Sequence, residues 1–167
     1  MTIAEEQKEI LHTAYNESFS EWTPKDSELI QSRNELITTI TKEISELKYH
    51  LASEKIYQYV WSTFADVILE ESKIIFNGRL ERKDPTEPEN PAKNWSALKA
   101  GTQEEKQSRI QFLLHTLRSI LVITHPFMPL VTEELWSILL TGKSLTEREH
   151  DKIEPATLLM AQKWPNL

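Results

Sequence analysis

The chain has 167 residues, of which 19 are basic and 26 acidic, giving a formal net charge of −7, and it contains three glycines and no cysteine. A chain of this length forms about one domain and can bury a single hydrophobic core. The lack of cysteine excludes disulfides, thiolate metal sites and thiol nucleophiles. No apolar run approaches the roughly 18 residues that span a bilayer, so we expect a cytoplasmic protein without a membrane anchor.

The first half of the chain predicts two long helices. Apolar residues recur every three or four positions, which is the spacing of one buried helix face. Thr23 and Pro24 suit the N-cap and the first position of a helix, and the stripe that follows predicts a helix over 24–48. A second stripe predicts a helix over 51–76, which ends at Gly78 because glycine readily adopts the left-handed conformation.

The second half predicts a loop and two more helices. Residues 77–101 hold three prolines among charged and small residues, which predicts a long Pro-rich loop. The capping box over 102–105 begins a third helix, which must bend or end at Pro126. A fourth helix is predicted over about 132–140 and closes at Gly142.

Together these elements predict an all-α fold, an antiparallel helical bundle with a long Pro-rich loop. We expect one domain over 1–167, with an N-terminal helix or linker over 1–22, the bundle over 23–142 and a C-terminal tail over 143–167 that packs back on it. The N-terminal helix has a weaker apolar stripe than the others. Its members are Ile3, Ile10, Leu11 and Ala14.

Two Glu-x-x-His pairs raise the alternative of a metal enzyme. Glu9/His12 and Glu147/His150 have the spacing that places two ligands on one helix face, and di-iron bundles use two such pairs with two further carboxylates. The second pair lies in a stretch without an apolar stripe, so solvated charges explain it better. A di-iron enzyme is therefore a remote alternative, and we expect no metal site.

The negative charge is distributed unevenly along the chain. Residues 1–72 carry six basic and fourteen acidic side chains and residues 110–167 five and six, whereas residues 73–109 carry eight basic and six acidic ones. Basic side chains beside an aromatic residue, here Trp95, suit a phosphate backbone and unstacked bases. The alternative is a solvated loop whose charges nearly cancel.

One twelve-residue string resembles a known family. Residues 125–136, HPFMPLVTEELW, resemble the HPFMPF-(V/I)-TEELW signature in the anticodon-binding helical domain of valyl-tRNA synthetases. Residues 29–36 resemble that domain's first helix, residues 49–73 its second helix, and Trp164-Pro165 the dipeptide that ends it. The resemblance covers most of the chain from about 22 to 165.

The sequence departs from the family pattern at a few positions. Val67-Ile68 stands where the family has Trp-Tyr, and Leu130 stands where it commonly has Phe. The anticodon domains of isoleucyl- and leucyl-tRNA synthetases therefore stay open as alternatives, as does a helical protein-interaction module. The chain also lacks the HIGH and KMSKS motifs of the family's catalytic domain.

The resemblance implies that the chain binds the anticodon stem-loop of a tRNA, tRNA-Val in the valyl case, as one domain of a valine-tRNA ligase. It is not expected to be catalytic alone. We expect no cofactor in this domain, with ATP and Mg bound by the catalytic domain of the parent enzyme. The expected partners are the tRNA and that catalytic domain, with no membrane, and the chain is expected to be a monomer.

Candidate tRNA-binding residues lie in two parts of the sequence. Near the start of the helix that faces the anticodon in the family lie Trp22, Lys25, Arg33 and Asn34. In the basic segment lie Lys73, Arg79, Arg82, Lys83, Trp95 and Lys99. The cations would neutralise phosphates, while aromatic and guanidinium faces would stack on splayed bases. For Trp22, packing at the helix entrance is the alternative.

Overall fold

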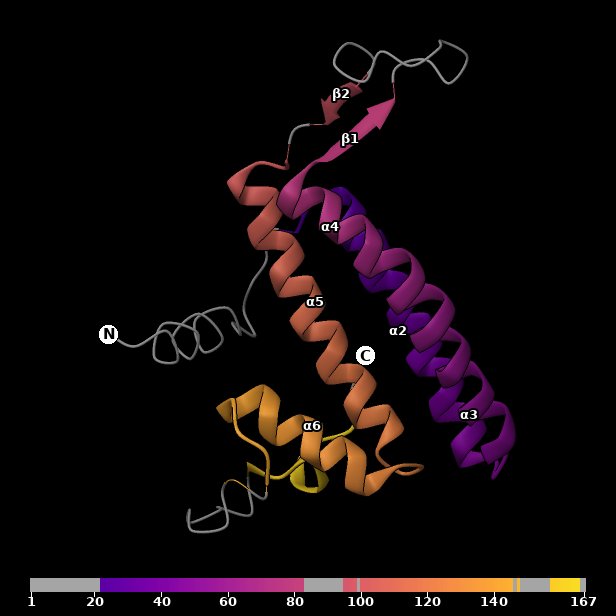
Figure 1. Cartoon of the computed structure of the whole chain (residues 1–167). Helices are drawn as coiled ribbons and strands as arrows, with labels where there is room; N and C mark the ends of the chain where they lie inside the picture. The colour runs from indigo at the N-terminus through magenta and orange to yellow at the C-terminus, as the bar shows by residue number, and fades with distance from the viewer. Residues whose placement is uncertain (1–21, 83–94, 99, 146, 148–156, 166–167) are drawn as a thin grey trace.

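The computed structural model describes residues 22–82, 95–98, 100–145, 147 and 157–165, with only the backbone of 79–82 and 95–98. Its elements are the helices α2 (Pro24–Ser45), α3 (Tyr49–Gln58), α4 (Glu70–Asn77), α5 (Gln103–Thr124) and α6 (Pro129–Thr141), the π-helix η1 (Tyr59–Leu69), the 3₁₀ helix η4 (Leu159–Ala161), and the strands β1 (Arg79–Arg82) and β2 (Trp95–Leu98). Figure 1 shows α2 beside the run from α3 to α4, with α5 against them and α6 crossing the far end of α5. The predicted all-α bundle is confirmed.

The start of α2 follows from its capping residues. The Thr23 hydroxyl accepts a hydrogen bond from the Asp26 backbone N–H at 3.2 Å, and Pro24 occupies the first turn. The helix ends at Ser45, three residues before the predicted end, and Leu47 then adopts a φ of 61° in the turn to α3. The predicted start is therefore correct and the predicted end is slightly late.

The second predicted helix is one continuous run from α3 through η1 to α4, covering 49–77. Its middle eleven residues form a π-helix, whose hydrogen bonds reach one residue further along the chain than those of an α-helix. Tyr59, Phe64 and Ile68 are its buried residues, and the step of five positions from Tyr59 to Phe64 fits the wider turn. A search for α-helical spacing detects the run but not this change of register.

The segment over 77–101, predicted as a loop, begins and ends with paired strands. β1 and β2 are antiparallel, with Arg79 opposite Leu98 and Arg82 opposite Trp95. The base of this hairpin is closed by a hydrogen bond of 2.8 Å from the Gly101 N–H to the Ile75 carbonyl. The strands were missed because each is only four residues long, which is too short to show a clear apolar alternation, and β1 is mostly charged.

The third and fourth helices begin and end where local signals place them. Thr102 and Glu105 form the predicted capping box at the start of α5, with both reciprocal hydrogen bonds present. The helix α6 begins at Pro129, three residues earlier than predicted, because proline suits the first helical turn. It closes at Gly142, which is left-handed with a φ of 70°.

The core consists of three apolar clusters along the bundle. One lies between α2, α3 and α5, the second joins η1 to α5, and the third joins α5 to α6 and the C-terminal tail. The tail packs back as expected: Leu159 is buried in the third cluster, and Trp164 donates from Nε1 to the Thr41 hydroxyl at 2.8 Å. Among the described residues, no helix is both long and apolar enough to cross a membrane.

Candidate nucleic-acid interface

Four elements meet at one end of the bundle, which we call the hairpin end: the start of α2, the end of α4, the β1–β2 hairpin and the start of α5 (Figure 1). The Thr23 backbone N–H donates to the Ser108 hydroxyl at 3.0 Å and so ties α2 to α5. Lys25 forms an ion pair with Glu71 at 2.8 Å and ties α2 to α4. Residues far apart in sequence therefore build this end together.

A buried ion pair fixes the two helix starts against each other. Arg109 Nη2 lies 2.9 Å from Asp26 Oδ1, and both side chains are 1% exposed. The other carboxylate oxygen of Asp26 accepts from the Ser108 hydroxyl at 2.6 Å and from the Thr23 hydroxyl at 2.8 Å. The Arg109 guanidinium also lies 5.5 Å from the centre of the Phe112 ring. The cation of Arg109 is therefore used inside the bundle and is unavailable to a ligand.

The lysine candidates Lys25 and Lys73 lie on the surface of the hairpin end. Lys25 pairs with Glu71, and Lys73 pairs with Glu70 three residues before it. Ion pairs this exposed contribute about 0–1 kcal/mol, so a stronger anion can displace the carboxylate. Both lysines stay candidates for phosphate binding, and each is held by a carboxylate neighbour in an exposed ion pair.

Trp22 lies partly in the core. It packs against the cluster of Tyr59, Phe64 and Phe112, and its ring meets His115 edge to face with centroids 5.7 Å apart. This packing supports the alternative of a structural role at the helix entrance. Trp22 is half-buried, and it stays a candidate for base stacking as well.

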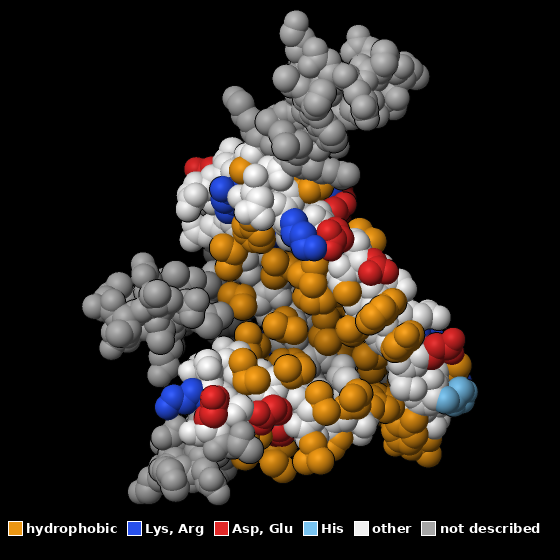
Figure 2. All heavy atoms as spheres, viewed as in Figure 1, with side chains coloured by type: hydrophobic (Ala, Val, Ile, Leu, Met, Phe, Trp, Pro, Cys, Tyr) orange, Lys and Arg blue, Asp and Glu red, His pale blue; other side chains and the backbone are white. Residues whose placement is uncertain are grey.

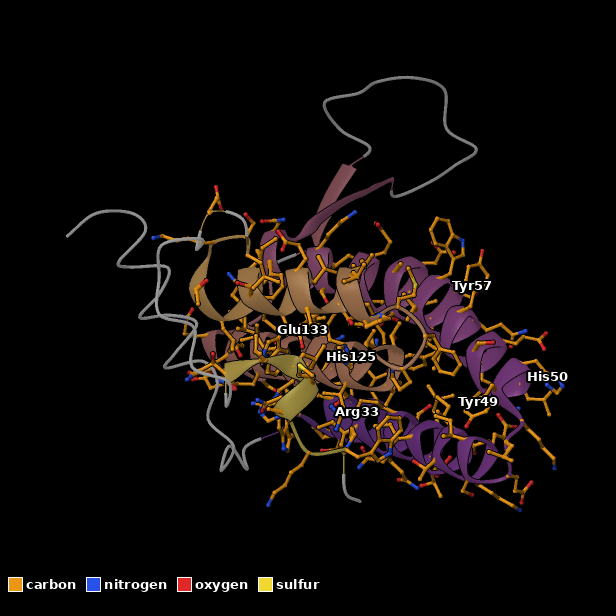
Figure 3. All side chains as sticks on the ribbon, turned by 90° about the horizontal axis from the view of Figure 1, so that it is seen from below. Arg33, Tyr49, His50, Tyr57, His125 and Glu133 are labelled. Carbon is orange, nitrogen blue, oxygen red and sulfur yellow. The ribbon has the colours of Figure 1, made fainter. Side chains whose placement is uncertain are left out.

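Arg33 and Asn34 lie more than two turns further along α2. The Arg33 guanidinium donates to Asn34 Oδ1 at 3.1 and 3.3 Å and to the Thr116 hydroxyl of α5 at 3.4 Å. Burial lowers the pKa of Arg33, while the negative charge that Tyr59 acquires on ionisation acts in the opposite direction. Figure 3 shows Arg33 on the inner side of α2, whereas His50 and Tyr57 lie at the outer edge of the bundle. Arg33 therefore bridges α2 and α5.

The remaining candidates belong to the hairpin. The backbone places Arg79 and Arg82 on β1 and Trp95 on β2, with Arg82 opposite Trp95. Lys83 and Lys99 lie outside the described residues. The structure thus brings Trp22, Lys25 and Lys73 to the same end as the two strands and separates them from Arg33 and Asn34.

A groove of about 590 Å³ runs along η1 and α4 beside the hairpin end. Among the described side chains, Asp66, Glu70 and Glu71 line it together with one cation, Lys73. Three carboxylates repel a phosphate, so this groove is a poor site for an RNA backbone. The described side chains that line this groove along α4 therefore form no basic surface.

No group of three His, Asp or Glu side chains suited to a metal ion occurs among the described residues. Of the two Glu-x-x-His pairs, Glu9, His12 and His150 fall outside the described ranges. The described residues therefore supply no support for the di-iron alternative.

Comparison with known proteins decides the family. Residues 26–167 match the family model described as the anticodon-binding domain of tRNA ligase. The chain belongs to this family. It is 32% identical over 113 residues to the valine-tRNA ligase of Aquifex aeolicus, a match that covers 68% of the chain and 9% of that ligase. It is 31% identical over 140 residues to the valine-tRNA ligase of Enterococcus faecalis, covering 83% of the chain and 13% of that ligase. The anticodon-binding domain thus spans about a tenth of the length of these relatives.

In this anticodon-binding domain, the string at 125–136 forms the corner between α5 and α6. His125 Nδ1 lies 2.8 Å from the Thr132 hydroxyl across the turn. Glu133 accepts hydrogen bonds from two backbone N–H groups of the tail, and Trp136 donates from Nε1 to the Thr157 carbonyl at 2.9 Å. The string at 125–136 therefore holds the corner between α5 and α6 and the tail in place.

Proposed function

We propose that this anticodon-binding domain binds the anticodon stem-loop of tRNA-Val as part of a valine-tRNA ligase. The observation that carries the proposal is the family match over 26–167, joined with relatives that are valine-tRNA ligases. The surface at the hairpin end adds a physical reason, since exposed cations from two helices and arginines from a strand are gathered there.

Binding would begin with the phosphates of the stem-loop. Lys25 and Lys73 exchange their carboxylate partners for phosphate at small cost, because the ion pairs that they leave are exposed and weak. Arg79 and Arg82 on β1 would add two further cations. Trp22 and Trp95 of β2 are the candidates to stack on unpaired bases.

The net charge of −7 limits the affinity of this chain by itself. A polyanion is repelled by the acidic remainder of the surface, so binding depends on local contacts and weakens steeply with salt. Useful affinity then requires the other domains of a ligase. Amino-acid activation with ATP and Mg would belong to the catalytic domain, and this chain would contribute tRNA recognition as a monomer in the cytoplasm.

The test is a filter-binding titration of the chain with the tRNA-Val anticodon stem-loop over a series of salt concentrations. Lys25→Ala and Lys73→Ala should each weaken binding and reduce the slope of log K against log salt by about 1, because each removes one phosphate contact. The matched controls are Lys42→Ala and Lys163→Ala, exposed lysines that lie away from the hairpin end, and they should leave the slope unchanged.

Specificity is tested with stem-loops that carry an isoleucine or leucine anticodon. Preference for the valine anticodon supports the valyl assignment, and preference for another anticodon transfers the proposal to that ligase. Absence of binding even at low salt would favour the alternative of a protein-interaction module.

A further inference from the structure

The described part of the C-terminal tail, residues 157–165, crosses the bundle as a segment that we call the strap. It begins beside α6, crosses α5 and finishes beside α2 (Figure 1). At the α6 end, Trp136 Nε1 donates a hydrogen bond to the Thr157 carbonyl at 2.9 Å. At the α2 end, Trp164 Nε1 donates to the Thr41 hydroxyl at 2.8 Å. The strap therefore links α6 to α2 across α5.

The strap is attached to the helices through side chains and not through a backbone ladder. Both carboxylate oxygens of Glu133 are used, since Oε2 accepts from the Leu159 N–H at 2.9 Å and Oε1 from the Met160 N–H at 2.7 Å. On α5, Arg118 Nη2 donates to Gln162 Oε1 at 3.3 Å. Among the described residues, the backbone–backbone hydrogen bonds of the strap join its own residues only. A single carboxylate therefore holds the middle of the strap.

The buried side chain of the strap is Leu159, which is 2% exposed, whereas the next residue, Met160, is 71% exposed. Leu159 completes the third apolar cluster, whose other buried members lie on α5 and α6 and are Leu121, Val122 and Trp136. Figure 2 shows that apolar side chains already lie open to solvent across the middle of one face of the molecule. Exposing one further cluster therefore does not require the helices to separate.

The attachments of the strap are few and depend on one another. Detaching it exposes Leu159 and breaks no backbone hydrogen bond of α2, α5 or α6, so it requires less free energy than unfolding of the bundle. Glu133 and Trp136 lie three positions apart, so one face of α6 carries both of its anchors. Hydrogen bonds to a carboxylate are about twice as strong as those between neutral groups, and two of them end on Glu133. The Glu133 carboxylate is therefore the principal polar anchor.

We propose that residues 157–165 open as one unit while the helices stay folded, and that Glu133 is the latch that holds this unit closed. On opening, Leu159 leaves the third cluster and Trp164 leaves α2. The link from α6 to α2 is then lost, and the apolar surface between α5 and α6 becomes accessible. This conformational device does not depend on the proposed binding of tRNA.

The test is hydrogen exchange of the full chain, followed by NMR at several urea concentrations below the unfolding transition. Two strap groups that do not bond to Glu133 report the opening of the strap. They are the Ala161 amide, which donates to the Leu158 carbonyl, and the Trp164 indole N–H at the α2 end. The amide of Ile120, a buried residue of α5, reports opening of the bundle.

Two variants make the same chemical change on neighbouring residues. Glu133→Gln removes the charge and leaves one carbonyl oxygen to serve the two N–H donors of the strap. Glu134→Gln is the matched control, because the Glu134 carboxylate accepts from the Leu145 N–H at 3.0 Å rather than from the strap. The two variants therefore separate the latch from a general effect of losing a carboxylate on α6.

In the unaltered chain, the protection factors of the Ala161 amide and the Trp164 indole should agree, lie at least about tenfold below that of Ile120 and depend less on urea, because opening exposes little surface. Glu133→Gln should lower both strap values by about tenfold, which corresponds to about 1.4 kcal/mol, and leave Ile120 unchanged. Glu134→Gln should leave all three unchanged.

Three results would overturn the proposal. Faster exchange confined to the Leu159 and Met160 amides would show that the strap does not open as one unit. An equal loss of protection at Ile120 would show that the bundle opens with it. An equal effect of Glu134→Gln would show that Glu133 is not the latch.

Discussion

Replacing Asp26 with asparagine removes the charge from the buried pair with Arg109 and leaves the shape of the side chain almost unchanged. Arg109 remains charged, because a guanidinium does not deprotonate in a protein, and at 1% exposure it cannot regain water. Its Nε and Nη1 already lack hydrogen-bond partners among the described residues, so the carboxylate of Asp26 is its main compensation. The substitution therefore leaves a buried charge without a counter-charge.

The expected loss is about 3–5 kcal/mol of unfolding free energy, the range found when one partner of a buried pair is removed. With a urea m value of about 2 kcal/mol/M, the midpoint of unfolding falls by about 1.5–2.5 M. Urea unfolding followed by far-UV circular dichroism measures this shift. Since domains of this size are stable by only about 5–15 kcal/mol, the variant approaches the limit of folding.

The control is Asp66→Asn, which makes the same chemical change on an exposed carboxylate and should alter stability by no more than about 0.5 kcal/mol. A second measurement combines Asp26→Asn with Arg109→Met. Removing both charges should destabilise the chain by less than the sum of the single changes, because neither charge is then left alone. If Asp26→Asn lowers the midpoint no more than Asp66→Asn does, the reasoning about the buried pair is wrong.

Three further changes test other parts of the fold. Tyr59→Phe should leave stability at neutral pH unchanged or slightly higher, since the buried hydroxyl has no hydrogen-bond partner among the described residues. Burial raises the pKa of Tyr59, so ionisation of its hydroxyl is less favourable in the folded chain than in the unfolded chain. The stability of the fold is therefore unaffected by this ionisation below about pH 10, the ordinary tyrosine pKa, and falls at higher pH. Tyr59→Phe should reduce this alkaline loss of stability in urea titrations, and an unchanged loss would contradict the reasoning. Thr102→Ala should lower thermal stability by about 1 kcal/mol by removing the cap of α5, and an unaltered melting temperature would exclude a contribution from that cap. Gly142→Ala should lower stability by about 1 kcal/mol, because alanine is strained in the left-handed backbone conformation. The added methyl group meets no other atom within 4 Å, so the backbone alone accounts for this cost. A neutral result in calorimetry would show that the helix end adjusts.

Local signals in the sequence were sufficient to predict where α2 and α5 begin. The caps at Thr23 and Thr102 involve residues only three positions apart, so they are visible without the fold. The break at Pro126 and the close at Gly142 are local in the same sense. The helical-bundle fold depends on the number and spacing of such helices, so it could be predicted from the sequence.

The sequence could not predict which residues far apart in the chain contact each other. Ser108 meets Asp26 across 82 positions, and no feature of either neighbourhood indicates the pairing. Arg33 appears in the sequence as an ordinary helix cation, but its position opposite Thr116 makes it part of the interior. The grouping of the candidate residues could not be read from the sequence, since only the fold brings the strands that carry Arg79, Arg82 and Trp95 to the same end as the start of α2. Their role in tRNA binding stays a prediction.

The closed base of the hairpin makes this end of the bundle a natural place for variation during evolution. The hydrogen bond from Gly101 to Ile75 and the pairing of β1 with β2 fix the distance between the point where the chain leaves α4 and the point where it returns to α5. This distance does not depend on what connects Arg82 to Trp95. Each doubling of the length of such a connection costs only about 0.6 kcal/mol in closure entropy. Insertions and deletions there can accumulate without disturbing the clusters that hold the helices together. The length of that connection is therefore thermodynamically uncoupled from the packing of the bundle.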